Sequence, residues 1–327
     1  MKKKMMIGAV IVLLIGGGFW LYKNKTSASN SKAKNQLEDL NNYHLEANME
    51  MTINDELKTY KVDVDYLKKD SDLFRVNIYD KTLNQSQIII RNYDGVFVYT
   101  PSMNQVYKFK SEWPYNSDKP YIYQTLLSYF DKENEIEKNK EGVTLKSAVT
   151  YPHDEKIVSQ EIRFDKNMIP LHISLFDEDE AEHVKVEFTK VIVNESIDET
   201  LFNVEQLTAS QTASTLTDDF PLMPLELMGT ELSLQEECSI DGTPTHILQF
   251  SGEKAFTLIQ SLVEPKETLE TVETSAELVD LVNGVAMFEN NQLQYLYPGL
   301  TCSVYSNTMS KKEMIEVVSS LQNEVLK

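Results

Sequence analysis

A regular alternation of apolar and polar residues begins at Tyr43 and constrains this chain more than any other feature. In residues 43–53, YHLEANMEMTI, an apolar side chain stands at every second position. Successive side chains of a strand point to opposite faces, so this rhythm predicts a strand with one buried face and one face in water. The rhythm returns in residues 60–66 and 74–78. We therefore expect a mainly antiparallel sheet.

Residues 91–109, RNYDGVFVYTPSMNQVYKF, continue the same series of strands. Asp94 and Gly95 form a two-residue hairpin signal, because glycine accepts the positive φ that such turns need. Pro101 and Asn104 supply a second turn. The segment therefore predicts a β-meander that extends the sheet, and none of its residues points to catalysis.

A short helix is expected in Tyr121–Phe130, where apolar residues follow helical spacing. The charged segment 131–142 predicts a solvated loop or an edge of the sheet. About ten strands with one helix are typical of a strongly curved sheet or an open barrel. We place this first domain at residues 36–206. Its later strands are expected in residues 143–149, 156–165, 170–177 and 183–194.

The composition changes near Leu207, and residues 207–220 are rich in Thr, Ser and Ala, which predicts an interdomain linker. Residues 221–327 are then expected to form a small α+β domain. Two helices are predicted behind capping boxes at Thr274–Glu277 and Ser310–Glu313. The strands of this domain are predicted in THILQF, KAFTLIQSLV, GVAMFENNQLQYLY and LTCSVYS.

The N-terminal residues 1–25 combine a basic start with an uncharged run from Met5 to Tyr22. A helix of that length is about 27 Å long at ~1.5 Å per residue, enough to span the hydrocarbon core of a bilayer. We interpret it as an uncleaved transmembrane anchor, with a cleaved signal peptide or a buried core helix as alternatives. Residues 26–35 are small and polar and predict a flexible tether. A short basic tail normally stays inside, so we expect a single-pass protein of the cell membrane with an extracytoplasmic body.

The net charge of −20 limits the partners of this body. Nucleic-acid binding needs clustered lysine and arginine against phosphate, so a nucleic-acid partner is not expected. An anionic membrane surface would also repel such a body. Contact with the membrane is therefore expected through the N-terminal helix alone.

Two cysteines, Cys238 and Cys302, remain in the chain. In an exported protein they could form a disulfide, and the alternative is a pair of buried free thiols. Sequence alone does not contain the pairing geometry, so both interpretations stay open.

Catalytic signatures are absent from the sequence. It contains no G-x-S-x-G, P-loop, dinucleotide fingerprint or H-E-x-x-H motif. His172 and His183 flank the acidic residues 177–182, where a weak metal site is conceivable, but a solvated turn is the stronger interpretation. We therefore expect no enzyme activity, no metal and no other cofactor.

Aromatic residues crowd into the region of residues 93–123. They could line an apolar concavity that accepts an acyl chain or a hydrophobic element of a partner. Alternatively, they could form the core and edges of a β domain, where aromatics are enriched in any case. The candidate ligand-binding residues are Tyr93, Phe97, Tyr99, Tyr107, Phe109, Trp113 and Tyr121.

Several motifs together resemble a known family. They are the strand QSQIIIRN, the meander DGVFVYTPSMNQVYKF, the loop WPYNSDKP and the segment IDETLFNV, preceded by a possible helix in LEDLNNY. This order over residues 35–205 resembles the lipoprotein carrier (LolA/LolB) and RseB-like superfamily. It is most similar to the YdcC- or GerS-like sporulation-associated envelope lipoproteins. KAFTLIQSL and YSNTMSKKEMIEVVSSL resemble the C-terminal module of that group.

The resemblance implies a half-open antiparallel barrel wrapped around a helix, with a hydrophobic interior. The carriers hold lipoprotein acyl chains there, the regulators bind a partner protein, and one spore-branch member partners a cell-wall amidase. This chain departs from the spore branch because it has no lipid-attachment cysteine near its apolar segment. We expect a non-enzymatic envelope or spore-assembly protein that binds a lipid, a lipoprotein or a protein through the concavity. The alternative is a scaffold that docks a cell-wall hydrolase without binding lipid.

Overall fold

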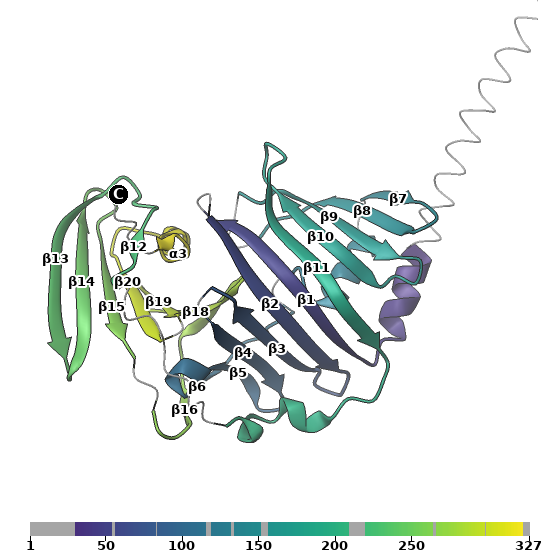
Figure 1. Cartoon of the computed structure of the whole chain (residues 1–327), viewed down its shortest axis with the longest axis horizontal. Coiled ribbons are helices and arrows are strands. Elements are labelled where there is room, and N and C mark those ends of the chain that lie inside the picture. Colours follow the sequence, from purple (N-terminus) through teal and green to yellow (C-terminus); the bar gives the residue numbers. More distant parts are fainter. Residues whose placement is uncertain are drawn as a thin grey trace, which may run out of the picture.

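The computed structural model describes residues 30–53, 56–82, 84–115, 119–131, 134–151, 156–208, 220–263, 266–297 and 299–322. Two sheets side by side make up the molecule (Figure 1). The predicted anchor 1–25 lies outside the described residues, and so does most of the predicted linker 207–220. Within the described ranges, no helix has both the length and the apolar character that a membrane crossing requires.

The first sheet has twelve strands, in the order β16-β6-β5-β4-β3-β2-β1-β11-β10-β9-β8-β7. All neighbours are antiparallel except β16 and β6, so the predicted antiparallel class is confirmed. The sheet is open, because β16 and β7 end it without pairing to each other. The strands are β1 (Asn42–Ile53), β2 (Glu56–Leu67), β3 (Leu73–Asp80), β4 (Gln85–Asn92), β5 (Gly95–Thr100), β6 (Gln105–Phe109), β7 (Glu135–Lys138), β8 (Gly142–Ala148), β9 (Ser159–Asp165), β10 (Pro170–Phe176), β11 (Glu182–Val193) and β16 (Glu270–Glu273).

The alternation in the sequence separates the two faces of this sheet. On β1, Tyr43, Leu45 and Met49 are fully buried on the inner face, while the polar residues between them are half-buried on the outer face. The hairpin between β4 and β5 turns at Tyr93 and Asp94, and Gly95, whose φ is +138°, pairs with Asn92 at the start of β5. Asn104 takes the left-handed conformation in the turn before β6, after the 3-10 helix η1 (Pro101–Met103). The predicted strands, the hairpin and the second turn are present, but the two turn residues of the hairpin are Tyr93 and Asp94, one position earlier than predicted.

The inner face of the sheet is covered by short helices of the same chain. The predicted helix is present as α2 (Tyr123–Ser128), followed by the 3-10 helix η2 (Tyr129–Asp131). Leu126, Leu127 and Phe130 are buried in the core that the sheet also lines. The ring of Tyr123 packs edge-on against Tyr43 at 5.7 Å between centroids. The curved sheet therefore wraps around a helix, as the resemblance implied, and side chains of the chain itself cover its inner surface.

Residues 30–38 form a helix, which corrects two expectations. The predicted flexible tether 26–35 was wrong where it overlaps this helix. The helix that the resemblance placed in LEDLNNY lies earlier in the chain, because β1 already begins at Asn42. Ala33 and Leu40 are only 1% exposed against the main core. Their burial stabilises a segment whose polar composition alone does not predict a helix.

The second sheet has seven strands, in the order β13-β14-β15-β20-β19-β18-β17. The helix α3 (Lys311–Ser319) packs its apolar side into the core of this module. The two-residue strands β12 (Met223–Pro224) and β21 (Leu321–Gln322) pair with each other. The seven strands are β13 (Glu231–Ile240), β14 (Thr243–Ser251), β15 (Phe256–Leu262), β17 (Glu277–Leu281), β18 (Gly284–Glu289), β19 (Gln292–Tyr297) and β20 (Leu300–Tyr305).

One of the two predicted capping boxes is real. At the start of α3, Ser310 Oγ accepts a hydrogen bond from the backbone N–H of Glu313, and the Glu313 carboxylate accepts one from the backbone N–H of Ser310. The box at Thr274 was wrong, because Glu277–Leu281 is strand β17. Thr274 instead accepts a bond from the backbone of Ala276, which closes a turn before the strand. The burial of every second residue on β17 shows that pairing with β18 overrides the local helix signal.

The possible disulfide between Cys238 and Cys302 is not formed, and both cysteines are free. Cys238 lies on β13 and Cys302 on β20, with β14 and β15 between them. Three strand spacings of ~4.8 Å separate the two residues by roughly 14 Å. A disulfide needs Cα atoms less than about 7 Å apart. The alternative of two free thiols is therefore the correct one, although only Cys302 is buried.

The cap of α3 provides a test of this module. We expect Ser310→Ala to lower the free energy of unfolding by about 1 kcal/mol, because it leaves backbone N–H groups of the first turn without an acceptor. Chemical denaturation of the full chain measures the loss. Ser239→Ala, at an exposed position of β13, is the control and should change stability by less than about 0.5 kcal/mol. Equal stabilities for the two variants would contradict the cap.

Candidate functional site

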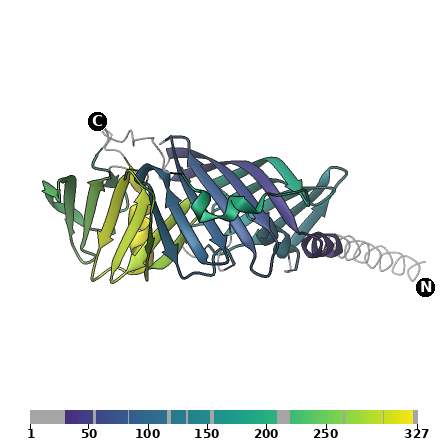
Figure 2. The same cartoon turned by 90° about the horizontal axis from the view of Figure 1, so that it is seen from below.

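The two modules meet along a seam that is part of the main core. Val285 and Met287 of β18 belong to the same buried cluster as the inner face of the large sheet. Strand β16 runs parallel to β6 and extends the first sheet by one strand from the second module. The two sheets lie end to end in Figure 2. The modules are thus joined both by apolar contacts and by a shared sheet.

A buried ion pair lies in this seam. Lys119 Nζ is 2.6 Å from Asp280 Oδ1, and the two side chains are 2% and 11% exposed. Lys119 also donates to the carbonyl oxygen of Leu281. Trp113 Nε1 donates to the same carboxylate oxygen at 3.2 Å. The segment before α2 is therefore joined to strand β17 by the Lys119–Asp280 ion pair and by two hydrogen bonds, from Trp113 to Asp280 and from Lys119 to Leu281.

Burial makes this ion pair sensitive to the loss of either partner. Desolvation lowers the pKa of Lys119, and the negative charge of Asp280 opposes that effect. The Asp280 Oδ2 atom is buried without a hydrogen-bond partner, so its charge depends on Lys119 for compensation. An isolated buried charge costs several kcal/mol, whereas a neutral replacement of both partners costs far less.

Backbone groups complete the seam. Gln87 Oε1 accepts from the Val285 amide at 2.9 Å, and Ser102 Oγ accepts from the Gly299 amide at 2.9 Å. Asn104 Nδ2 donates to the Lys266 carbonyl at 2.7 Å. Each bond joins a side chain of the first module to a backbone group of the second. Such bonds fix the relative position of two backbones, since the acceptor and donor cannot move independently.

The seam contains two of the seven aromatic residues that were predicted to bind a ligand. Trp113 and Tyr121 are fully buried. Trp113 contacts Asp280 as described, and Tyr121 donates its hydroxyl to the Val282 carbonyl at 3.2 Å. Phe109 is also buried in the main core. These three rings are packed against protein on the inner side of the sheet.

The other four candidates lie elsewhere. Phe97 and Tyr99 point to the opposite face of β5, where they form a small core with Val106 under residues 204–207. Tyr107 is partly buried against the main core. Tyr93 is 59% exposed and its hydroxyl is 3.3 Å from Glu199 Oε1. The seven residues therefore do not line one surface, and ligand binding by them stays a prediction.

A small pocket lies between the two modules. Its volume is about 40 Å³, whereas sites for small-molecule ligands measure about 300–1,000 Å³. A water molecule needs roughly 10–15 Å³ on this scale, so the pocket accepts a few waters and no acyl chain. Residues that line it include Lys58, Tyr60, Gln85, Gln87, Asn283 and Leu296.

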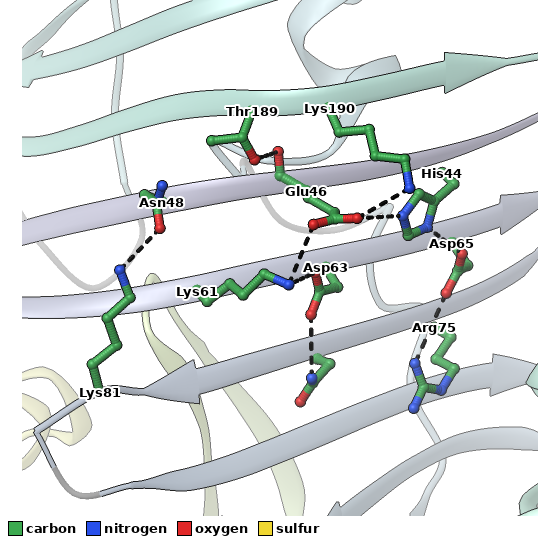
Figure 3. A network of polar contacts seen from close by, with 11 residues as sticks. His44, Glu46, Asn48, Lys61, Asp63, Asp65, Arg75, Lys81, Thr189 and Lys190 are labelled. Carbon is green, nitrogen blue, oxygen red and sulfur yellow. Dashed lines mark hydrogen bonds and ion pairs between the residues drawn. The ribbon is translucent and has the colours of Figure 1, made fainter.

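The outer face of β1, β2, β3 and β11 carries a network of charges (Figure 3). Glu46 lies at its centre, 3.3 Å from His44 Nε2, 3.3 Å from Lys61 Nζ and 3.2 Å from Lys190 Nζ. Hydrogen bonds from His44, Lys190 and Lys61 lower the pKa of Glu46 to about 2. His44 Nδ1 also contacts Asp65 at 2.8 Å. The network joins side chains of neighbouring strands across the outer face of the sheet.

The two histidines around the acidic turn do not form a joint site. His183 Nε2 is 2.7 Å from Asp177 Oδ2, and His172 Nε2 is 2.8 Å from Ser174 Oγ. Ser174 is buried, so its hydroxyl does not face a substrate. Among the residues that the structure describes, no group of three or more His, Cys, Asp or Glu side chains could hold a metal ion.

The sequence analysis missed the residues that join the modules. Lys119 and Asp280 are 161 positions apart, and each stands in an ordinary loop or strand pattern. The three residues before Lys119 in the sequence are Asn, Ser and Asp, so no apolar periodicity marks Lys119 for burial. The one usable signal was Trp113, since a buried indole N–H requires an acceptor nearby.

Comparison with known proteins completes the description. No family model matches the chain. The sporulation protein YdcC of Bacillus subtilis is 30% identical over 334 residues, which cover 98% of this chain and 96% of that protein.

Solved structures resemble the chain only distantly. The MucA/MucB complex of Pseudomonas aeruginosa is 15% identical, with 91% of this chain and 99% of that chain covered and a TM-score of 0.34. An outer membrane lipoprotein-sorting protein domain from Vibrio parahaemolyticus is 12% identical, with 54% and 95% covered and a TM-score of 0.32. The CwlD amidase–GerS lipoprotein complex of Clostridioides difficile is 13% identical, with 50% and 90% covered and a TM-score of 0.19.

The buried ion pair yields the first prediction for this site. We expect Lys119→Met to lower the free energy of unfolding by about 3–5 kcal/mol, because it leaves the Asp280 carboxylate buried and unpaired. Adding Asp280→Asn should restore a large part of the loss, since the amide oxygen still accepts from Trp113 and no charge remains. Chemical denaturation of both variants measures the difference. If the double variant were as unstable as the single one, the charge pair would not be the cause.

The outer network yields a prediction for pH. The folded pKa of Glu46, about 2, lies below its ordinary value of 4.5. Its stabilisation is therefore fully present above pH 4.5 and is lost as the pH falls through 2. We expect Glu46→Gln to cost about 1–2 kcal/mol at pH 7, allowing for solvent screening of a side chain that is partly exposed, and little once the pH is below 2.

The control for this experiment is Glu50→Gln, four residues further along β1 on the same face. Glu50 forms no ion pair with a described residue. Urea denaturation of both variants between pH 7 and pH 2 provides the profile. A loss at Glu46 that does not change with pH would show that the effect is packing and not charge.

Proposed function

Because this chain belongs to the family of the sporulation protein YdcC, we propose that it is a non-enzymatic binding protein of the envelope that takes part in spore assembly. The full-length relationship supports the sporulation context. The membrane anchor in residues 1–25 and the extracytoplasmic position of the body are parts of this proposal, and they rest on the basic start and apolar run of the sequence.

Of the two ligand classes expected from the resemblance, a protein partner is favoured over a lipid. The supporting observation is the packing of the inner face of the twelve-stranded sheet. Leu45, Met49 and Val62 are fully buried there, and α2 lies in the same core. An acyl chain would have to displace these contacts. Exposing a large apolar side chain costs about 1.5–3 kcal/mol. A partner protein can bind the outer surface without that cost.

The rigid seam suits such a role. The shared strand β16 and the buried Lys119–Asp280 pair join both modules into one body. A partner then meets a preformed surface, and little free energy is spent on ordering two loose domains. The function we propose is that of a scaffold or regulatory subunit, and a cell-wall enzyme is the partner class that the family resemblance suggests for that role.

The test uses the full chain in intact sporulating cells that carry it. Chemical crosslinking, purification in detergent and mass spectrometry identify bound proteins and bound lipids in one sample. We expect a specific protein adduct, and lipid at the level of a control membrane protein with the same residues 1–35. An acyl-chain lipid bound in about equimolar excess over that control, without a protein adduct, would support the carrier role and contradict the scaffold.

A further inference from the structure

Four strands lie at the outer edges of the two large sheets, β7 and β16 in the first and β13 and β17 in the second, and β13 differs from the other three. Strand β17 has five residues, and the carbonyl of its last residue, Leu281, accepts from Lys119 in the seam. Strands β7 and β16 are only four residues long. Strand β7 also carries a lysine, Lys138, and Glu273 of β16 pairs with Lys108 of the neighbouring strand β6. Short length and lysine are ordinary protection against the addition of a foreign strand. Strand β13 has ten residues and no lysine.

The outer edge of β13 is free along this length. It pairs with β14 from Glu231 to Ile240, and no described strand pairs with its other side. Apolar residues stay in water at both ends, with Leu232 42% exposed and Ile240 48% exposed. A row of unpaired backbone groups beside exposed apolar side chains is the surface that strand addition uses, because the backbone supplies affinity and the side chains supply specificity.

We propose that β13 is a docking edge on which an extended, basic segment of a partner protein adds as a further strand. This inference rests on the partner-binding function proposed above. The docking edge lies at the end of the molecule that is farthest from the helix of residues 30–38 (Figure 2).

The charge of the hairpin determines the chemistry of the partner. Residues 226–253 contain six carboxylates and neither lysine nor arginine. Three of them, Glu231, Glu236 and Glu237, lie on β13 itself and are exposed. None of these three forms an ion pair with a described residue. An incoming strand with lysine or arginine would pair with them across the new ladder, where opposite charges contribute roughly 0.2–1 kcal/mol each.

Two other occupants fit the edge less well. In a second copy of this chain, antiparallel pairing of β13 with β13 would set the carboxylates of the two copies against each other, which is unfavourable. The basic residues near the start of the same chain lead into the helix of residues 30–38, at the opposite end of the molecule from β13 (Figure 2). A basic segment of another protein therefore fits best.

A designed peptide tests the edge without knowledge of the natural partner. The probe is a fluorescent ten-residue peptide of alternating Lys and Val, added to the full chain in detergent and followed by fluorescence anisotropy. Hydrogen exchange measured by mass spectrometry reports whether the amides of β13 become protected. We expect binding, slowed exchange in β13, and no binding of a matched peptide with Glu in place of Lys. A peptide with Pro in place of Val should also fail, because it lacks the donors of a strand.

The matched variants separate the edge from general attraction to an acidic protein. Glu236→Lys combined with Glu237→Lys should raise the Kd of the Lys-Val peptide about tenfold or more. Glu178→Lys combined with Asp179→Lys makes the same charge change in the exposed turn before β11 and should change it less than about twofold. Equal effects of the two pairs, or unchanged exchange in β13, would overturn the proposal.

The crosslinking experiment distinguishes failure of this edge from failure of the proposed function. We expect the protein adduct to be lost from cells that carry Glu236→Lys with Glu237→Lys and to persist with Glu178→Lys and Asp179→Lys. An adduct that persists with both pairs would overturn docking at β13 and leave the partner-binding function standing. Circular dichroism of the purified variants verifies that the hairpin is folded in each.

Discussion

Burial of the inner face of the twelve-stranded sheet is the constraint on which the rest of this structure depends. An open curved sheet presents a continuous apolar surface, and that surface must be covered by lipid, by a partner or by the chain itself. Here the chain covers it with α2, with the segment before α2 and with part of the second module. The concave face of the sheet is thereby packed like an ordinary core.

The same requirement explains the seam. Because the second module contributes Val285, Met287 and Leu296 to the core of the first, the two cannot separate without exposing apolar surface. The Lys119–Asp280 pair adds little net stability compared with an apolar pair of the same size. Its effect is on geometry, since the carboxylate also accepts from Trp113 and so admits one arrangement of the loop against β17.

The sequence predicted those parts of the fold that depend on neighbouring residues. The alternation from Tyr43, the hairpin at Gly95 and the cap at Ser310 all arise from local chemistry, and the structure contains them. The failures depend on distant residues. The capping box predicted at Thr274 is a turn in the structure, because the following residues form β17 and pair with β18. Lys119 is buried because it pairs with Asp280, 161 positions away. The sequence left open whether the aromatic residues 93–123 line one concavity or pack in the core, because that depends on which face of the sheet each strand residue meets.

The parallel pairing of β16 with β6 has a consequence for folding during synthesis of the chain. Lys108 and Glu273 join these strands across 165 positions. A ribosome that adds about 5–20 residues per second needs roughly 10–30 seconds to make the intervening chain. Until then, the outer edge of β6 lacks its partner strand β16 and is open to pairing with another extended chain. The first sheet is complete only after residues 270–273 have been made, so a chaperone that covers the edge of β6 would have its greatest effect in that interval.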